Sequence, residues 1–287
     1  MSYPRIGLVL GAGGARGIAH IPVLEALDDL GIRPAAVAGA SIGAIIGAGV
    51  AAGLSAAEVR ERFLAVFGSR SSALAKLWQL RPRRIADLMV ADNYGLGKLD
   101  PQKVLSVFVG DAIPARFADL AIPFTAVATD FYGGEEVRFT EGDLPSAVAA
   151  SMALPGLFRP VLIDGRVMID GGVMNPVPTN ALPADLDLVI AVDVVSFPEP
   201  RDDRPLPTGI DTVVGAAQLM MQLIIAEKLR ERPPDILVRA PVGPFHALDF
   251  LKSRQMLEAA APMREEVKRR LTRQIEAPQA RPVLTGP

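Results

Sequence analysis

The sequence predicts an α/β fold with a mainly parallel central sheet and helices on both faces. Residues 6–10 and 188–195 are almost entirely apolar runs, which are typical of parallel strands covered on both sides. Residues 6–66 alternate strand, helix, strand and helix, the order that builds a parallel sheet. The chain has 287 residues, half of them hydrophobic, so it can bury one large core of this kind.

The first helix should end near Leu30, with Gly31 as its stop. Pro22 restricts its start, because proline fits without penalty only in the first helical turn. The helix therefore either begins late or kinks beside the glycines that precede it. A short strand follows, ending at residues 37–38, and then a helix over residues 42–52.

The rest of the chain continues this mixture of elements. A capping box of Ser55 and Glu58 predicts the next helix, and glycine turns predict two hairpins, over residues 124–140 and 161–169. Further helices are expected at residues 144–152, 211–231, 248–260 and 263–275, with a strand at 236–238. We predict one domain over residues 4–275 and a frayed tail over residues 276–287.

Composition narrows the class of function. The formal charge of −2 gives no general attraction to nucleic acid, and the lack of cysteine excludes disulfides, thiolate metal sites and a cysteine nucleophile. No basic region or cleavage site of a signal peptide precedes the first strand. Residues 212–226 are uncharged but contain two glutamines and are shorter than the roughly 20 residues of a membrane span, so we expect a buried helix. These features predict a cytoplasmic protein, with peripheral membrane contact left open.

A serine between two glycines marks the turn after the second strand. Ser41 lies in GASIG, and Gly39 and Gly43 supply the small residues that a tight nucleophile elbow requires. The N–H groups at the start of the next helix would favour negative charge there. An alternative is that residues 34–57, which carry no charge, form a membrane helix, but so much alanine and glycine is only weakly lipophilic.

A serine hydroxyl needs a base. The two histidines are weak candidates, because His20 lies on an apolar helix face and His246 in a late loop. A carboxylate shielded from water can take this role. Asp170 is the first choice, because it ends a strand and precedes Gly171 and Gly172, which let a substrate approach closely. Asp193, inside an apolar strand, is the second; Asp130 also ends a strand, and Asp164 is interpreted as a turn former.

The glycine-rich segment GAGGARG, residues 11–17, admits two interpretations. As a dinucleotide fingerprint it would suit an oxidoreductase, but Arg16 replaces the last glycine and no acidic residue ends the second strand. As an oxyanion hole it would supply free N–H groups from Gly13, Gly14 and their neighbours beside the serine. Arg16 would add charge or anchor the loop. The second interpretation fits better.

Residues 69–97 interrupt the alternation of strands and helices. They combine five basic residues between Arg70 and Arg84 with Trp78 and several leucines. A basic segment with an aromatic residue suits a lid resting on an anionic lipid surface. It suits a solvated loop and helix equally well, and both interpretations stay open.

Taken together, the motifs resemble those of the patatin-like phospholipases. GAGGARG, GASIG and DGG follow the order of that family's pattern, which is G-x-G-x-x-[KR]-G, then G-x-S-x-G, then D-G-[GA]. LPGLF at residues 154–158 and DGGVMNPVP at residues 170–178 add to the likeness, which spans roughly residues 4–195.

The resemblance implies a three-layer patatin-like domain that hydrolyses lipid acyl esters without calcium, metal or cofactor, as a phospholipase A or lysophospholipase does. Ser41 would be the nucleophile and Asp170 the base of a dyad that passes through an acyl-enzyme. The oxyanion hole would lie on the loop of Gly11, Gly13, Gly14, Ala15 and Arg16. A lipid-binding or regulatory protein on the same fold remains an alternative, as do a thioesterase and a general carboxylesterase. The oligomeric state is left open.

Overall fold

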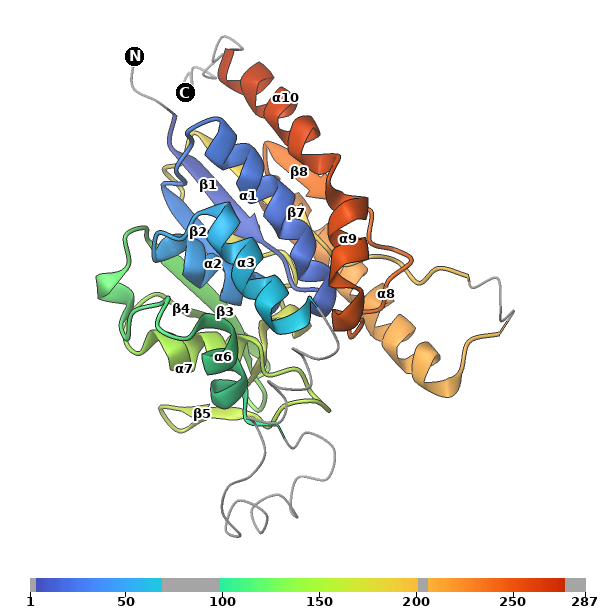
Figure 1. The fold of residues 1–287 in the computed structure, drawn as a ribbon. Helices are drawn as coiled ribbons and strands as arrows, with labels where there is room; N and C mark the ends of the chain where they lie inside the picture. The colour runs from blue at the N-terminus through green and yellow to red at the C-terminus, as the bar shows by residue number, and fades with distance from the viewer. Residues whose placement is uncertain (1–3, 69–98, 201–205, 277–287) are drawn as a thin grey trace, which may run out of the picture.

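A computed structural model describes residues 4–68, 99–200 and 206–276. Within these residues one eight-stranded sheet organises the chain, with the order β5-β6-β3-β2-β1-β7-β8 and β4 paired to β3 (Figure 1). The strands are β1 Ile6–Leu10, β2 Ala36–Ala40, β3 Phe124–Asp130, β4 Glu135–Phe139, β5 Val161–Ile163, β6 Arg166–Asp170, β7 Leu188–Asp193 and β8 Ile236–Arg239.

The middle of the sheet is parallel. Strands β3, β2, β1, β7 and β8 pair in parallel, whereas β4, β5 and β6 join through antiparallel pairings. β1 and β2 are buried along their whole length, as the apolar run predicts. Because parallel strands end at one edge, the segments that follow β1 and β2 emerge side by side.

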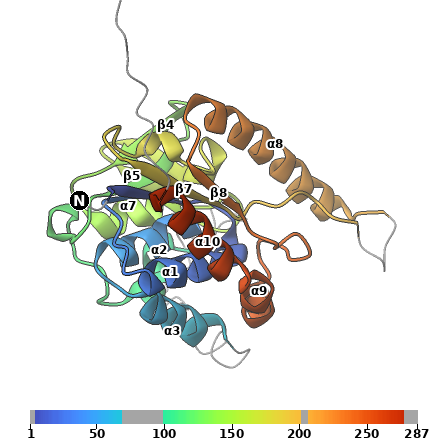
Figure 2. The same cartoon turned by 90° about the horizontal axis from the view of Figure 1, so that it is seen from above.

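Helices cover both faces of the sheet, which confirms the predicted fold class. In Figure 2, α8 lies on one face and α1, α3, α9 and α10 on the other. Two hydrophobic cores reflect this layering: Leu8 and Leu10 of β1 belong to one, and Val9, which points the other way, to the second. The α-helices are α1 His20–Asp29, α2 Ile42–Ala51, α3 Ala56–Phe67, α6 Pro101–Val109, α7 Leu144–Ser151, α8 Gly209–Glu231, α9 Ser253–Ala260 and α10 Met263–Glu276.

Local sequence explains several boundaries. The glycine-rich loop leads into a 3-10 helix, η1 (Gly14–Ala19), and α1 begins only at His20. Pro22 therefore falls in the first turn of α1, so the helix begins late rather than kinking. Ser55 caps α3 in the predicted capping box, and Asp164, at φ 50°, turns the β5–β6 hairpin.

The prediction of a buried helix at residues 212–226 was wrong. The helix exists as α8, but it lies on the surface, and Val213 and Leu223 are 70% and 73% exposed. Among the described residues it is the helix long and apolar enough to cross a membrane, judged by length and composition. The sequence pattern could not show that α8 lies on the surface, because an uncharged, apolar helix can have the same composition whether it is buried in a core or exposed on an apolar surface.

Two predictions fall on residues outside the described ranges. Residues 69–98 contain the basic segment with Trp78, and residues 277–287 contain almost all of the predicted frayed tail. Both therefore stay predictions.

Candidate active site

Ser41 lies between the end of β2 and the start of α2, where the chain turns sharply. Its φ of 56° and ψ of −124° belong to a region that residues with a side chain rarely adopt. Such a backbone persists only where the surroundings hold it, and it turns the side chain of Ser41 out of the sheet toward its carboxyl edge.

The two glycines of the elbow are required by space. A β-carbon on Gly43 would lie 2.0 Å from the carbonyl oxygen of Leu10, and one on Gly39 would lie 2.4 Å from the carbonyl oxygen of Gly43. Both obstacles are backbone atoms, which cannot move aside as a flexible side chain could. Glycine at these positions lets α2 start tight against β1 and β2, and so fixes the place of Ser41.

Asp170 meets Ser41 from the end of β6. The hydroxyl of Ser41 donates a hydrogen bond of 2.6 Å to Oδ2 of Asp170, across 129 residues of sequence. The other carboxylate oxygen, Oδ1, accepts from the N–H of Gly172 at 2.7 Å. Gly171 permits the turn, because a β-carbon there would lie 1.9 Å from the carbonyl oxygen of Val127. The carboxylate is thus fixed on both oxygens, with one facing the serine.

Burial sets the proton affinity of Asp170. The residue is 3% exposed, and loss of water raises its pKa from 3.8 to about 6, although the hydrogen bonds from Ser41 and Gly172 act in the opposite direction. A carboxylate with a raised pKa accepts a proton more readily and is still ionised at neutral pH. These are the properties that a general base requires.

Ser151, at the end of α7, is a contact that sequence reasoning missed. Its hydroxyl accepts a hydrogen bond of 3.0 Å from the backbone N–H of Ser41 and donates one of 2.6 Å to the carbonyl oxygen of Val127. The Ser151 hydroxyl therefore links the backbone of the elbow to β3. No motif marks Ser151, because a lone serine at a helix end has no distinctive pattern.

The glycine-rich loop adjoins both of these residues. Ala12 lies beside Gly172, where an added β-carbon would come within 2.7 Å of the Ala12 side chain. Similarly, Gly17 faces Ile42, the residue after Ser41, at 2.4 Å from an added β-carbon. The three predicted motifs thus come together at one place in the fold.

The N–H groups of the loop fall into two classes. Three are used in backbone bonds: Gly11 donates to Val192, Ala12 to Pro176 and Ala15 to Ala247, at 3.0, 2.8 and 2.7 Å. The N–H groups of Gly13 and Gly14 make no hydrogen bond to any residue that the structure describes. Those two donors are the ones left for a ligand.

Arg16 anchors the loop from inside. Its side chain is 2% exposed, and its guanidinium donates to the hydroxyl of Ser196. With the amide of Gln218 turned so that its oxygen faces Arg16, that oxygen accepts two further hydrogen bonds of 2.7 and 2.9 Å. Burial lowers the pKa of Arg16 to about 10, against the attraction of Asp193 and Asp249, so the group is cationic at neutral pH.

His20 has the structural role predicted for it. It is fully buried, its Nε2 donates to the carbonyl oxygen of Gly11 at 3.0 Å, and burial lowers its pKa to about 4. The neutral ring therefore holds the peptide between Gly11 and Ala12 in one orientation.

The other candidate acids lie in other settings. Asp193 accepts from the N–H of Val195 at 2.8 Å, lies 3.9 Å from Arg239, and has a pKa raised to about 6 by burial. Asp130 pairs with Arg166 at 2.7 Å. No hydrogen bond between described residues joins either acid to Ser41, and within those residues no group of three or more His, Asp or Glu side chains is placed to hold a metal ion.

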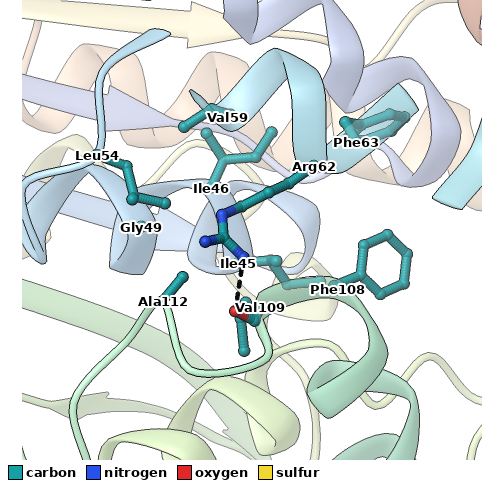
Figure 3. A pocket seen from close by; sticks show the side chains of 10 residues that line it. All are labelled: Ile45, Ile46, Gly49, Leu54, Val59, Arg62, Phe63, Phe108, Val109 and Ala112. Carbon is teal, nitrogen blue, oxygen red and sulfur yellow. Dashed lines mark hydrogen bonds between the residues drawn. The ribbon is translucent and has the colours of Figure 1, made fainter. Parts of the chain in front are cut away.

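A small pocket opens between α2, α3 and α6, with a cavity volume of about 40 Å³, and it is partly open to solvent (Figure 3). The Arg62 guanidinium extends into it and donates to the carbonyl oxygen of Val109 at 3.3 Å. Ile45 and Gly49 line it from α2, one and two turns beyond Ser41. The other lining residues are mainly apolar: Ile46, Leu54, Val59, Phe63, Phe108 and Ala112.

Comparison with known proteins agrees with this geometry. A model of the patatin-like phospholipase family matches residues 8–183. An uncharacterised NTE family protein of Mycobacterium tuberculosis is 33% identical over 236 residues, covering 80% of this chain and 61% of that protein. The lysophospholipase NTE1 of Yarrowia lipolytica is 31% identical over 279 residues, covering 88% of this chain and 18% of the yeast protein.

This chain therefore spans about three fifths of the mycobacterial relative and a small part of the yeast one. Among solved structures, VipD from Legionella pneumophila matches with a TM-score of 0.53 at 14% identity, over 94% of this chain and 67% of VipD, which is a likeness of fold. The family match covers more than half of the sequence and includes all three motifs that meet at Ser41. The chain belongs to the patatin-like phospholipase family.

Proposed function

We propose that this protein is a serine hydrolase of lipid acyl esters, of phospholipase A or lysophospholipase type. The observation that carries the proposal is the 2.6 Å hydrogen bond from Ser41 to a buried carboxylate, at an elbow that only glycines permit. The names of the family and of the yeast relative, a lysophospholipase, support lipid esters as the substrate class.

The proposed reaction starts with attack of Ser41 Oγ on the ester carbonyl carbon. Asp170 takes the hydroxyl proton, and the N–H groups of Gly13 and Gly14 bind the oxyanion that forms. Collapse of the tetrahedral intermediate breaks the ester bond, and the alcohol leaves with the proton from Asp170. Water, deprotonated by the same carboxylate, then releases the fatty acid from Ser41. No metal ion or cofactor enters these steps, so the proposal includes calcium independence.

The pocket of Figure 3 is mainly apolar and has room for a short stretch of hydrocarbon chain. Ile45 lines it from α2, one turn beyond Ser41, and apolar side chains from α3 and α6 complete the walls around the Arg62 side chain. We assign this pocket to the acyl chain of the substrate.

Covalent labelling tests the proposal directly. A fluorophosphonate should react with the folded protein, and mass spectrometry should place the adduct on Ser41. Ser41→Ala should remove both the adduct and ester hydrolysis. The control Ser106→Ala changes an exposed serine of α6 that donates to the carbonyl oxygen of Lys103, and it should keep both. Hydrolysis that survives Ser41→Ala would end the proposal.

One alternative keeps the fold without the reaction. A lipid-binding or regulatory protein would bind lipid and yet resist the fluorophosphonate. The buried position of Asp170 argues against it, because an ionised carboxylate away from water is costly, and no cation among the described residues pairs with it to offset that cost. Contact between the basic segment Arg70–Arg84 and anionic membranes also stays a proposal, tested by flotation with anionic vesicles.

A further inference from the structure

One side of α8 is an exposed apolar surface. No charged side chain occurs from residue 212 to residue 226, and the large side chains that point outward are 49–73% exposed. We call this surface the outer face of α8 and define it by Val213, Leu219, Met220 and Leu223. A continuous apolar surface of this kind marks a place where something else binds.

The opposite side of α8 is fixed to the domain by polar contacts. Gln222 donates to the carbonyl oxygen of Val195, Gln218 faces Arg16, and Lys228 pairs with Glu136 at 3.2 Å. A helix that crossed a membrane would have to give up these contacts. Since they are present, α8 has the character of a helix that lies along an interface, with one face attached and the other free.

The helix that carries the outer face packs its inner side against the candidate active site. The inner side of α8 contacts the glycine-rich loop through Arg16, and its Met221 reaches within 3.4 Å of a β-carbon added to Gly172, two residues after Asp170. In Figures 1 and 2 the first half of α8 projects beyond the rest of the molecule. Exposed Phe197 and Leu206 lie on the chain that leads into it. The outer face is thus carried by a helix that is attached beside the residues around Ser41.

We propose that the outer face of α8 binds the lipid–water interface and holds the active site against it. The inference rests on the proposed function, because a lipid ester substrate is presented as a surface that must approach the side of the molecule holding Ser41. The apolar side chains of the outer face would insert at the hydrocarbon boundary of a bilayer. Because residues 212–226 carry no charge, this binding should not require anionic lipid.

The test uses the full chain and vesicles of phosphatidylcholine. The triple variant Leu219→Gln, Met220→Gln, Leu223→Gln replaces three exposed apolar side chains with glutamine. Glutamine is polar and has good helix propensity, so α8 should still form. We expect it to cosediment with vesicles at least about tenfold more weakly than the parent protein, and to lose hydrolysis of vesicle lipid in proportion. Hydrolysis of a soluble short-chain ester should remain unchanged, because none of the three residues contacts Ser41 or Asp170.

Controls separate the possible causes. Leu162→Gln changes a leucine of β5 that is 71% exposed. β5 is the edge strand at the opposite end of the sheet order from β8, so this variant should leave vesicle binding unchanged. Ser41→Ala should bind vesicles as the parent does while hydrolysing nothing. If the parent protein hydrolyses neither ester but binds vesicles through α8, the proposed function fails and the lipid contact stands.

Three results would overturn the inference. The first is equal vesicle binding by the parent protein and the triple variant. The second is an equal loss of binding in Leu162→Gln, which would show general apolar adhesion. The third is a dimer of the parent protein in sedimentation equilibrium that the triple variant abolishes, which would make a second copy of this chain the occupant of the outer face.

Discussion

Asp170 is a carboxylate held almost out of water, and its proton affinity should control the pH dependence of hydrolysis. Its pKa is raised to about 6, mainly by burial, and the base acts only when it is ionised. We therefore expect kcat/KM for a soluble ester to be level near neutral pH and to fall about tenfold per pH unit below pH 6. Initial rates across pH 4–8 measure this.

Asp193 provides the matched control, because burial raises its pKa to about 6 as well. Asp193→Asn should keep the acid limb at the same pH, whereas Asp170→Asn should lower kcat by about a thousandfold or more at every pH. An acid limb that disappears in Asp193→Asn would show that the wrong carboxylate has been assigned.

The same burial predicts that Asp170 lowers stability. The folded-state pKa of about 6 lies above the unfolded value of 3.8, so ionisation disfavours the folded state, and the free energy of unfolding falls as pH rises from about 4 to 6. Asp170→Asn removes this cost. At pH 7 we expect it to be more stable than the parent by up to about 3 kcal/mol, from two pKa units at 1.36 kcal/mol each.

Urea unfolding at pH 7 and at pH 4 checks this prediction. The gain in stability should be present at pH 7 and largely lost at pH 4, where the folded carboxyl is protonated and the unfolded one, with a pKa of 3.8, is partly protonated. A variant less stable than the parent at pH 7 would contradict it.

At the scale of elements, the contact between the β2–α2 turn and β1 leaves no room for a methyl group. Gly43→Ala would place a β-carbon 2.0 Å from the carbonyl oxygen of Leu10, and α2 would have to shift away from β1. We expect a loss of about 2–3 kcal/mol in stability, together with loss of hydrolysis. Gly209→Ala, at the start of α8, has no heavy atom within 4 Å of the added carbon and should change neither. Thermal unfolding with a soluble-ester assay compares the two.

The pocket between α2, α3 and α6 should determine the preferred chain length. Ala112→Phe adds a ring to the wall opposite α2, which shortens the space available to a hydrocarbon chain. We expect the ratio of kcat/KM for long-chain to short-chain esters to fall about tenfold or more. Ala112→Ser keeps the volume and should leave that ratio unchanged. A ratio that is unaffected by phenylalanine would place the acyl chain elsewhere.

Sequence predicted those parts of the site that depend on backbone geometry. Glycines at fixed offsets around Ser41 and after Asp170 are visible in sequence, because a tight turn permits few residue types. The position of Ser151 behind the elbow was not predictable, since a hydroxyl that caps one N–H leaves no pattern. Which loop amides remain free was equally hidden, because it depends on the carbonyls of Pro176 and Ala247, far along the chain.

At the scale of the whole molecule, the parallel order of the sheet was predictable and the surroundings of α8 were not. Apolar runs specify strands that are covered on both faces, and the structure places β1 and β7 side by side accordingly. An uncharged helix carries no such information about its neighbours. Composition gave the hydrophobicity of α8, and only the fold shows that one side of it faces outward.

The proposed mechanism also predicts the effect of chelators. Ser41 and Asp170 supply nucleophile and base, so EDTA or EGTA should leave the hydrolysis of a soluble ester within about twofold of its starting rate. Added calcium should not raise that rate. A chelator-sensitive rate that calcium restores would contradict the proposed mechanism.

The pairing of α1 with α10 has a consequence for the route of substrate. Arg264 and Lys268 of α10 both bind Asp29 at the end of α1, and in Figure 1 α10 finishes near the start of β1. Both described ends thus leave from the edge of the sheet opposite Ser41. The described chain therefore begins at Pro4 and stops at Glu276 on the side of the protein away from the nucleophile, so the route of substrate to Ser41 does not pass either of these two points.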